Sequence, residues 1–189
     1  MKPATCCICR THYVKSSPLQ KVCSPKCAIT HVSQTKDRQK GRAAAEDRRQ
    51  TREKLKAMET YPQLVKKAQT AFNAYIRCRD AGKPCISCGK HVMTDKVGGG
   101  ADCGHYRSVG SAVHMRFVEE NANLQCKQCN QYKSGNHVEY RKGLIERIGL
   151  EAVERIESDQ TLRKYTKEGL IELAKHYRAE ARKLQKERE

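Results

Sequence analysis

The stretch DCGHYRSVGSAVHMRFVEENANLQCKQCNQYKSGN, residues 102–136, decides the fold expected for this chain. It places a His shortly after an Asp, continues through an Asn-rich segment, and ends in a Cys-x2-Cys pair that runs into Asn and Lys. Such a segment is either a structural zinc knuckle that contacts nucleic acid or the working site of a nuclease.

The cysteines around this stretch have the spacing of zinc ligands. Cys85 and Cys88 form one Cys-x2-Cys pair, and Cys126 and Cys129 form another. Each pair presents two thiolates at one tight turn, and tetrahedral zinc needs two such turns. The alternative, four free buried cysteines, does not explain the paired spacing.

A second cysteine cluster lies near the start of the chain, where CCIC is followed by CSPKC. Cys9, Cys23 and Cys27 are three expected ligands, and the fourth is Cys6 or Cys7. Cys6 gives the commoner x2 spacing and is preferred. We therefore expect about two structural zinc ions per chain.

The composition indicates a polyanionic partner. The 189 residues carry a formal net charge of +17, while aromatic residues make up only 5% and Trp is absent. Each Lys or Arg set against a phosphate releases counterions, so nucleic acid is the natural partner, with an anionic membrane surface as the alternative. So few large apolar residues favour small metal-held units and exposed helices over one large core.

No membrane-spanning segment is expected, because no apolar run approaches the roughly 20 residues that a bilayer requires. The opening residues MKPATCCICR contain no apolar signal-peptide core. We expect a cytoplasmic protein of the bacterial host in a reducing compartment, where eleven cysteines favour metal over disulfides.

The segment enclosed by the central cysteines also carries groups suited to chemistry. Asp102, His105, Asn residues and a Lys all belong to one zinc-held unit. A four-Cys zinc site is closed and does no chemistry itself. A divalent ion on hard oxygen donors, beside a neutral His that deprotonates water, could attack a phosphodiester.

Basic side chains close in sequence to these groups are candidates for phosphate contacts. Contacts of this kind position a nucleic acid without identifying its bases. The candidates are Arg107, Arg116, Lys133 and Arg141.

These residues carry a family resemblance. PCISCG, GHYRS, MRF, CNQYKSGN and YR together resemble the NinG/Rap family of lambdoid phage recombination endonucleases, zinc-stapled His-Asn-His (ββα-metal) nucleases. The resemblance is close over about residues 60–175, and CSPKC with the charged segment after it matches in kind.

The resemblance implies an α+β fold: a small treble-clef-like ββα-metal unit, a β-hairpin followed by a helix, embedded among helices. It implies that His105 is the general base and that Asn121 orients it, with Asn123 as the near competitor. Asp102 and Asn130 would hold a catalytic Mg²⁺ or Mn²⁺. Three features depart from the family pattern. Gly104 stands where the family has Asp or His, Asn130 stands where it has a third His, and a glycine run, Gly98 to Gly100, precedes the base.

Four segments are expected along the chain. Residues 1–30 form an N-terminal zinc knuckle and residues 31–60 a charged helical linker, broken at Tyr61-Pro62. Residues 61–160 form the zinc-stapled endonuclease domain with flanking helices. Residues 161–189 form a C-terminal helix that starts near Thr166, and its apolar seam would suit either an intramolecular partner or a homodimer.

The sequence is therefore interpreted as a metal-dependent endonuclease. By resemblance its DNA substrates are branched recombination intermediates, such as Holliday junctions and D-loops. The alternative is a zinc-dependent DNA-binding recombination accessory protein without nuclease activity.

Overall fold

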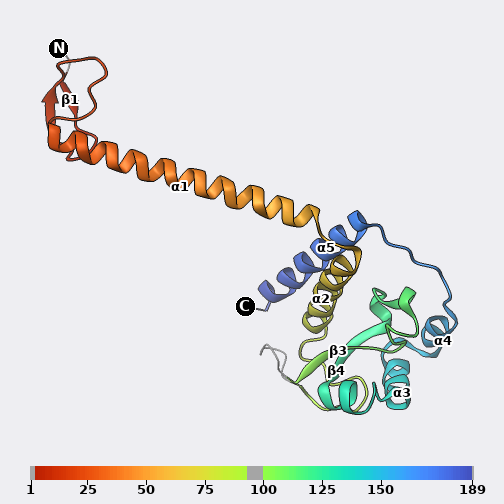
Figure 1. The fold of residues 1–189 in the computed structure, drawn as a ribbon. Coiled ribbons are helices and arrows are strands. Elements are labelled where there is room, and N and C mark those ends of the chain that lie inside the picture. The colour runs from red at the N-terminus through yellow and green to blue at the C-terminus, as the bar shows by residue number, and fades with distance from the viewer. Residues whose placement is uncertain (1–2, 93–99, 189) are drawn as a thin grey trace. The chain divides into compact units, whose positions relative to one another are not determined.

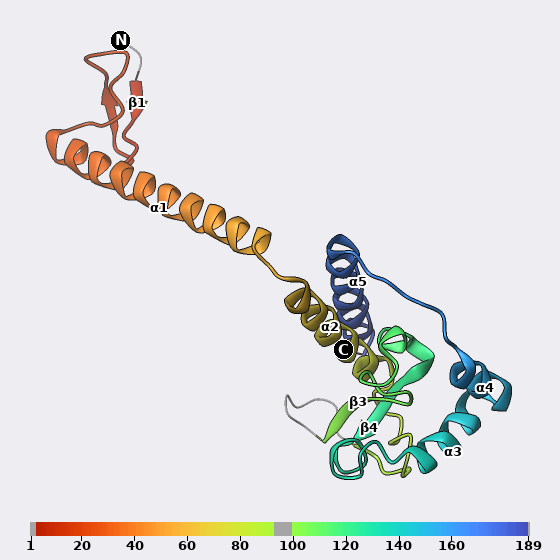
Figure 2. The ribbon, with the colours of Figure 1, turned by 45° about the vertical axis from the view of Figure 1, so that its right-hand side comes forward.

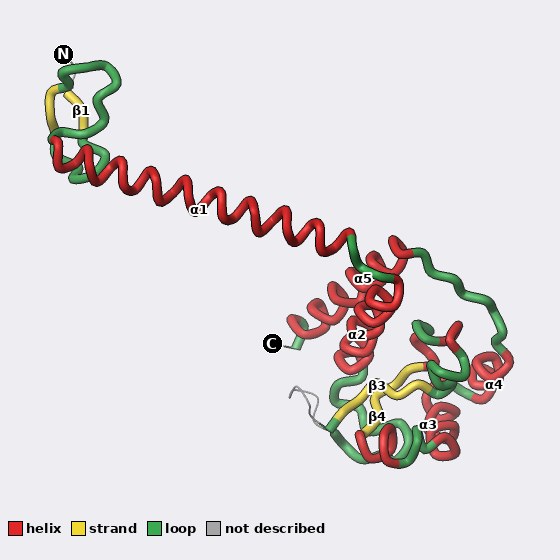
Figure 3. Tube along the Cα trace, viewed as in Figure 1, coloured by secondary structure: helices red, strands yellow, loops and turns green. Residues whose placement is uncertain are grey.

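The computed structural model describes residues 3–92 and 100–188. The chain divides into two compact units, Met1–Glu59 and Thr60–Glu189. The fold is mixed α+β and mostly helical, with two small two-stranded sheets (Figures 1 and 3). Among the described residues, no helix combines the length and the apolar character needed to cross a membrane.

The first unit opens with strands β1 (Pro3–Thr5) and β2 (His12–Val14), which pair antiparallel. Helix α1 (Pro25–Ala57) follows, and the side chain of Ser24 caps it by accepting a hydrogen bond from the amide of Cys27 at 3.3 Å. The helix thus begins inside the segment expected to be a separate knuckle, and Cys27 belongs to its first turn.

Helix α1 has no buried residue along its whole length. Its Ala, Arg, Lys, Glu and Gln residues have high helix propensity, so the helix forms without an apolar stripe. Surface ion pairs such as Arg49–Glu46, at 3.0 Å, add little to its stability. Helix α1 thus covers most of residues 31–60, the segment expected to be a charged helical linker.

The second unit begins with helix α2 (Tyr61–Arg79), which packs against helix α5 (Lys167–Lys186). A capping box of Thr60 and Gln63 starts α2, and Pro62 is accommodated in its first turn. The break in helicity therefore precedes Tyr61, and the proline belongs to the new helix. The rings of Phe72 and Tyr177 meet edge to face, 5.0 Å apart, in the core between the two helices.

Strands β3 (Ala101–His105) and β4 (Ala122–Cys126) form the central antiparallel pair, with Asp102 opposite Gln125 and His105 opposite Ala122. Ala122 belongs to the α2–α5 core. On the other side, the hydroxyl of Tyr140 in helix α3 (His137–Ile148) donates to the carbonyl of Gly104 at 2.9 Å. The pair therefore lies between two helical layers, as Figure 2 shows.

The second helical layer consists of α3 (His137–Ile148) and α4 (Leu150–Ser158), joined at Gly149. Their apolar side chains form a second core with Met115 and Ile86, and its helical members are Tyr140, Leu144, Val153 and Ile156. Two short 3-10 helices, η1 (Val113–Met115) and η2 (Glu119–Asn121), connect β3 to β4.

The turn after β4 differs from the expected α-helix. It is a single π-helical turn, η3 (Gln128–Tyr132), and α3 begins only at His137. Ser134, Gly135 and Asn136 all have positive φ angles, which a continuous right-handed helix does not allow.

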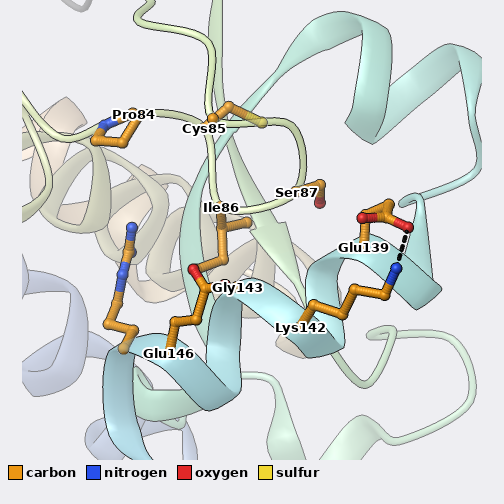
Figure 4. A pocket seen from close by; sticks show the side chains of 10 residues that line it. Pro84, Cys85, Ile86, Ser87, Glu139, Lys142, Gly143 and Glu146 are labelled. Atoms are coloured by element: carbon orange, nitrogen blue, oxygen red, sulfur yellow. Dashed lines mark hydrogen bonds and ion pairs between the residues drawn. The ribbon is translucent and has the colours of Figure 1, made fainter.

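The loop that carries the first central cysteines is seated on α3. A Cβ at Gly143 would lie 2.0 Å from the carbonyl oxygen of Ile86, so only glycine permits this approach. Figure 4 shows the pocket beside this contact, with a volume of about 380 Å³, and the ion pair of Lys142 and Glu139 at its edge.

A buried carboxylate joins α2, β4 and α3. Asp80 is fully buried and accepts hydrogen bonds from Arg79 at 2.8 Å, Lys83 at 3.1 Å and the amide of Leu124 at 3.1 Å, with Arg147 at 3.5 Å. Burial alone would raise the pKa of this carboxyl, but the hydrogen bonds and charge of its basic partners outweigh burial and lower it.

Candidate functional site

The central cysteine cluster has the geometry of a metal centre. The sulfur atoms of Cys85, Cys88, Cys126 and Cys129 all lie within 4.8 Å of one another. The sulfurs of Cys88 and Cys126 are 3.8 Å apart, close to the roughly 3.8 Å that tetrahedral zinc with 2.3 Å bonds requires. Backbone amides of Cys126 and Cys129 donate hydrogen bonds to the sulfurs of Cys85 and Cys126, respectively.

The N-terminal cluster is a second four-Cys group. The sulfurs of Cys6, Cys9, Cys23 and Cys27 lie within the same 4.8 Å of one another. The structure therefore gathers Cys6, while Cys7 is exposed outside the cluster. Each cluster can hold one metal ion such as zinc, and both would be closed structural sites.

His105, at the end of β3, is half-buried between α2 and the loop that leads to β4. Its ring lies 5.8 Å from the ring of Phe72, and its Nε2 is 3.0 Å from the backbone carbonyl oxygen of Arg116. A carbonyl oxygen only accepts, so Nε2 carries the proton and Nδ1 is the basic nitrogen of the ring. Burial lowers the pKa of His105, which keeps the imidazole neutral at pH 7.

The hydrogen bonds of Asn121 fix the loop that holds His105, and none of them is made to the imidazole. Its side chain is fully buried; Oδ1 accepts from the amide of Arg107 at 2.8 Å, and Nδ2 donates to the carbonyls of Arg107 at 3.0 Å and Met115 at 3.3 Å. These bonds set the backbone on both sides of the loop, next to the carbonyl of Arg116 that receives His105.

Asn123, the competitor of Asn121, has a different environment. Its Oδ1 accepts from Arg147 at 2.8 Å, and its Nδ2 lies 3.3 Å from the hydroxyl of Tyr140. These partners belong to α3, so Asn123 joins the sheet to that helix, while Asn121 secures the His105 loop.

The two expected oxygen ligands of the divalent ion are in contact. Asn130 donates from Nδ2 to Asp102 Oδ2 at 3.0 Å, and Gln131 donates from Nε2 to the same oxygen at 2.8 Å. Gln131 was not expected at the site. The π-helical turn η3 brings both Asn130 and Gln131 to the carboxylate of Asp102, and no pattern in the sequence predicts such a turn. If the side-chain amide of Asn130 were rotated so that its oxygen faced Asp102, the two side chains would offer oxygen ligands to a divalent ion.

Gly104 lies where the structure leaves no room for a side chain. A Cβ on Gly104 would lie 2.2 Å from Oε1 of Gln125, its neighbour on β4. Gln125 is itself fixed, because its Nε2 donates to Ser87 Oγ at 2.7 Å and to the carbonyl of Gly135 at 2.6 Å. Asp102 shares the strand face of Gly104, since side chains alternate along a strand.

By the same alternation, Asp102 and His105 belong to opposite faces of β3. The contacts agree, because Asp102 meets η3 while His105 meets α2 and the Arg116 carbonyl. The structure thus brings Asp102 to Asn130, and His105 to its orienting loop, but it does not place all three side chains around one point.

The four basic candidates have unequal environments. Arg107 donates to the carbonyls of Ile156 and Asp159, and Arg141 forms a two-bond ion pair with Glu157. Both guanidinium groups therefore tie α4 to the rest of the unit.

The other two candidates are more available to a ligand. The guanidinium of Arg116 has the neutral partner Gln69 at 3.2 Å, and the side chain of Lys133 is exposed. Arg116 and Lys133 are therefore better placed than Arg107 and Arg141 for phosphate contacts.

Cys103 is a core residue and no metal ligand of either cluster. It packs against the α2–α5 core, and burial raises the pKa of its thiol to about 12. A thiol that stays protonated is a poor ligand and nucleophile.

Comparison with known proteins gives a consistent result. The family model described as "Bacteriophage Lambda NinG protein" matches residues 1–187. The chain is 39% identical over 191 residues to "Protein ninG" of Salmonella phage P22 and of Escherichia phage lambda, covering 95% of this chain and 92% and 91% of those relatives. It is 44% identical over 124 residues to "Protein ninG" of Escherichia phage 933W, covering 66% of this chain and 59% of that relative. No solved structure matches the chain.

Proposed function

The chain belongs to the NinG family of bacteriophage proteins, and from this premise we propose that it is a divalent-metal-dependent DNA endonuclease of phage recombination. Its proposed substrates are branched DNA molecules such as Holliday junctions and D-loops. The substrate class comes from the resemblance to recombination endonucleases, and the chemistry comes from the residues described above.

The observation that carries the proposal is the hydrogen bond from His105 Nε2 to the Arg116 carbonyl. It selects the tautomer with a basic Nδ1, and burial keeps the ring neutral and able to accept a proton near pH 7. In the proposed reaction, His105 Nδ1 takes a proton from the water that attacks the phosphodiester. Asn121 acts as a positioning residue, because it fixes the loop whose carbonyl orients the ring.

Asp102 and Asn130 would hold the divalent ion, which supplies stabilisation of the negative charge that develops on the phosphate. Asp102 provides a carboxylate and Asn130 an amide oxygen after rotation of its side chain, and Mg²⁺ and Mn²⁺ prefer such oxygen ligands. Lys133, exposed directly after η3, would contact the DNA backbone. The two four-Cys sites would hold the fold and take no part in the chemistry.

The test is cleavage of a labelled four-way junction and a matched linear duplex in Mg²⁺ or Mn²⁺. His105→Ala should lower the cleavage rate by about 10²–10⁴-fold, the usual contribution of one general acid–base group. Zinc content and junction affinity should be unchanged. His176→Ala is the matched control, because that histidine is exposed on α5. Cleavage by folded His105→Ala at the wild-type rate would remove His105 from the reaction.

Asn130→Ala tests the metal part separately. This change removes a ligand and leaves the base, so it should raise the Mg²⁺ or Mn²⁺ concentration needed for half-maximal cleavage. The rate at saturating ion should fall less than in His105→Ala. An unchanged metal requirement would show that Asn130 is not a ligand.

Two observations favour the alternative function, a DNA-binding recombination accessory protein without nuclease activity. Asp102 already accepts two amide hydrogen bonds, and Gly104 leaves no room for a ligand beside the base. Tight junction binding without strand breaks in either ion would establish this alternative.

A further inference from the structure

A second pocket in the same unit is lined in part by Arg116. It has a volume of about 550 Å³, within the range of small-molecule sites. It opens beside the first turns of α2 and is called the α2 pocket below. Its aromatic lining residues are Tyr61, Phe117 and Tyr165, and its cationic ones are Lys66, Arg116 and Arg163.

The aromatic residues of the α2 pocket offer flat apolar surface. Phe117 and Tyr165 meet edge to face with ring centres 5.2 Å apart, which holds the two rings at a fixed angle. Tyr61 is 44% exposed in the first turn of α2, and its ring is available at the pocket edge. Surfaces of this kind stack on any nucleobase, because every base has a π face.

The charges around the α2 pocket favour an anion. No Asp or Glu is among its lining residues in the described part of the chain. Of its three cations, Arg163 is paired with Asp159 at 2.6 Å, whereas Arg116 has only the neutral Gln69 as its side-chain hydrogen-bond partner among the described residues. The exposed Lys66 adds a second positive charge without a salt bridge among the described residues, and the N-terminus of α2 adds its dipole.

We propose that the α2 pocket binds one unpaired nucleobase of the DNA substrate, with Lys66 and Arg116 on the adjoining phosphates. This inference rests on the proposed function for DNA as the ligand. A base inside a duplex is stacked on both faces and cannot enter, whereas a strand-displaced molecule such as a D-loop has unpaired bases that can do so. The bond between Arg116 and His105 would then link the bound base to the orientation of the general base.

The test compares two DNA duplexes that differ by one unpaired 2-aminopurine, measured without added divalent ions so that no cleavage occurs. Binding should change the fluorescence of the unpaired analogue as it stacks on the pocket, and the bulged duplex should bind more tightly than the plain one. Tyr61→Ala should lower the ratio of the affinities for the bulged and plain duplexes about tenfold, the effect expected for loss of a base–aromatic stack. Its affinity for the plain duplex should be unchanged.

Two controls separate a lost ring from a disturbed fold. Tyr61→Phe keeps the ring and should retain the preference. Ile171→Ala removes another half-exposed apolar side chain from outside the pocket and should also retain it. If Tyr61→Ala keeps the wild-type preference, or weakens both duplexes equally, no base enters the α2 pocket and the inference is overturned.

The outcome is independent of catalysis. His105→Ala should keep the preference for the unpaired base while it loses cleavage. A protein that prefers the bulged duplex but cuts no DNA would contradict the nuclease proposal and support the pocket. A protein that cuts DNA but does not prefer the bulged duplex would support the nuclease proposal and contradict the proposal for the pocket.

Discussion

Each of the two clusters consists of four cysteines, but the two clusters have different surroundings. In the central cluster Cys85, Cys126 and Cys129 are all buried, and the loop of Cys85 is seated on α3. In the N-terminal cluster only Cys6 is buried, and it is the one buried residue among those described in residues 3–59.

The difference teaches where each unit obtains its stability. The central cluster completes a unit that also has two apolar cores, so metal binding and packing support one another. The first unit has no such core in its described residues, and its helix depends on local propensity. The same substitution should therefore have different effects in the two units.

The largest difference is expected from the cysteines themselves. Cys126→Ser should unfold the second unit, because a structural zinc site contributes about 10–16 kcal/mol, as much as the stability of a whole domain. Cys9→Ser should leave that unit intact. Elemental analysis should find about two zinc ions per wild-type chain, and circular dichroism should follow the melting of each variant. Equal loss of structure in both variants would contradict the proposed difference between the two units.

Asp80→Ala should destabilise the second unit by about 3–5 kcal/mol, because it leaves buried cationic groups without their carboxylate. The matched change in the first unit is Asp47→Ala, on the exposed surface of α1, which should cost less than about 0.5 kcal/mol. Urea unfolding measures both. A small loss for Asp80→Ala would mean that water replaces the carboxylate readily.

Asp80 also sets a pH dependence. Its pKa in the folded protein lies below the ordinary 3.8, so its stabilising contribution is fully present above about pH 4. That contribution is lost as the pH falls through the lowered pKa. The stability difference between the wild type and Asp80→Ala should therefore shrink in acid and stay constant between pH 6 and about pH 8. A difference that grows in acid would have the wrong sign.

Gly104→Ala should destabilise the second unit by about 1–3 kcal/mol, the usual cost of overpacking. The added Cβ would meet Oε1 of Gln125, which Ser87 and the Gly135 carbonyl hold in place. Thermal melting followed at a β-sensitive wavelength would measure the change. A neutral result would show that Gln125 can move aside.

Gly41→Ala should have a small effect of the opposite sign. Gly41 lies inside α1 and has no atom within 4 Å of an added Cβ. The change should stabilise the helix by about 0.5–1 kcal/mol, since alanine loses less backbone entropy than glycine. Helical ellipticity of a chain ending after residue 59 would report it against the unchanged parent. A loss of helicity would reveal a packing contact that the first unit needs.

Much of this fold follows from local sequence signals. The paired cysteine spacings predicted both clusters, and Thr166 was the expected cap of α5, where its side chain accepts from the amide of Gly169 at 3.0 Å. The capping residue and the cysteine pairs act over a few residues, so spacing alone reveals them. Asp102 and Asn130, which the resemblance names as ligands of one ion, are in contact, and their role as ligands stays a prediction.

Features that depend on distant packing were not predictable. The buried setting of Asp80 depends on Arg147, which approaches from α3, and the need for glycine at position 104 depends on a side chain of the next strand. Arg107 and Arg141 looked like free surface cations, but their partners lie on and just after α4. Periodicity and charge describe one segment at a time and do not identify the segment that packs on it.

The packing of α2 on α5 has a consequence for synthesis on the ribosome. All ligands of the N-terminal cluster emerge by Cys27, so the first unit can bind its metal early in translation. Helix α2 emerges soon afterwards, but its partner α5 begins only at Lys167. The part of the apolar face of α2 that α5 covers therefore stays exposed while the central sheet, both central knuckles and α3 are made. A nascent chain halted in this interval would present that surface to chaperones.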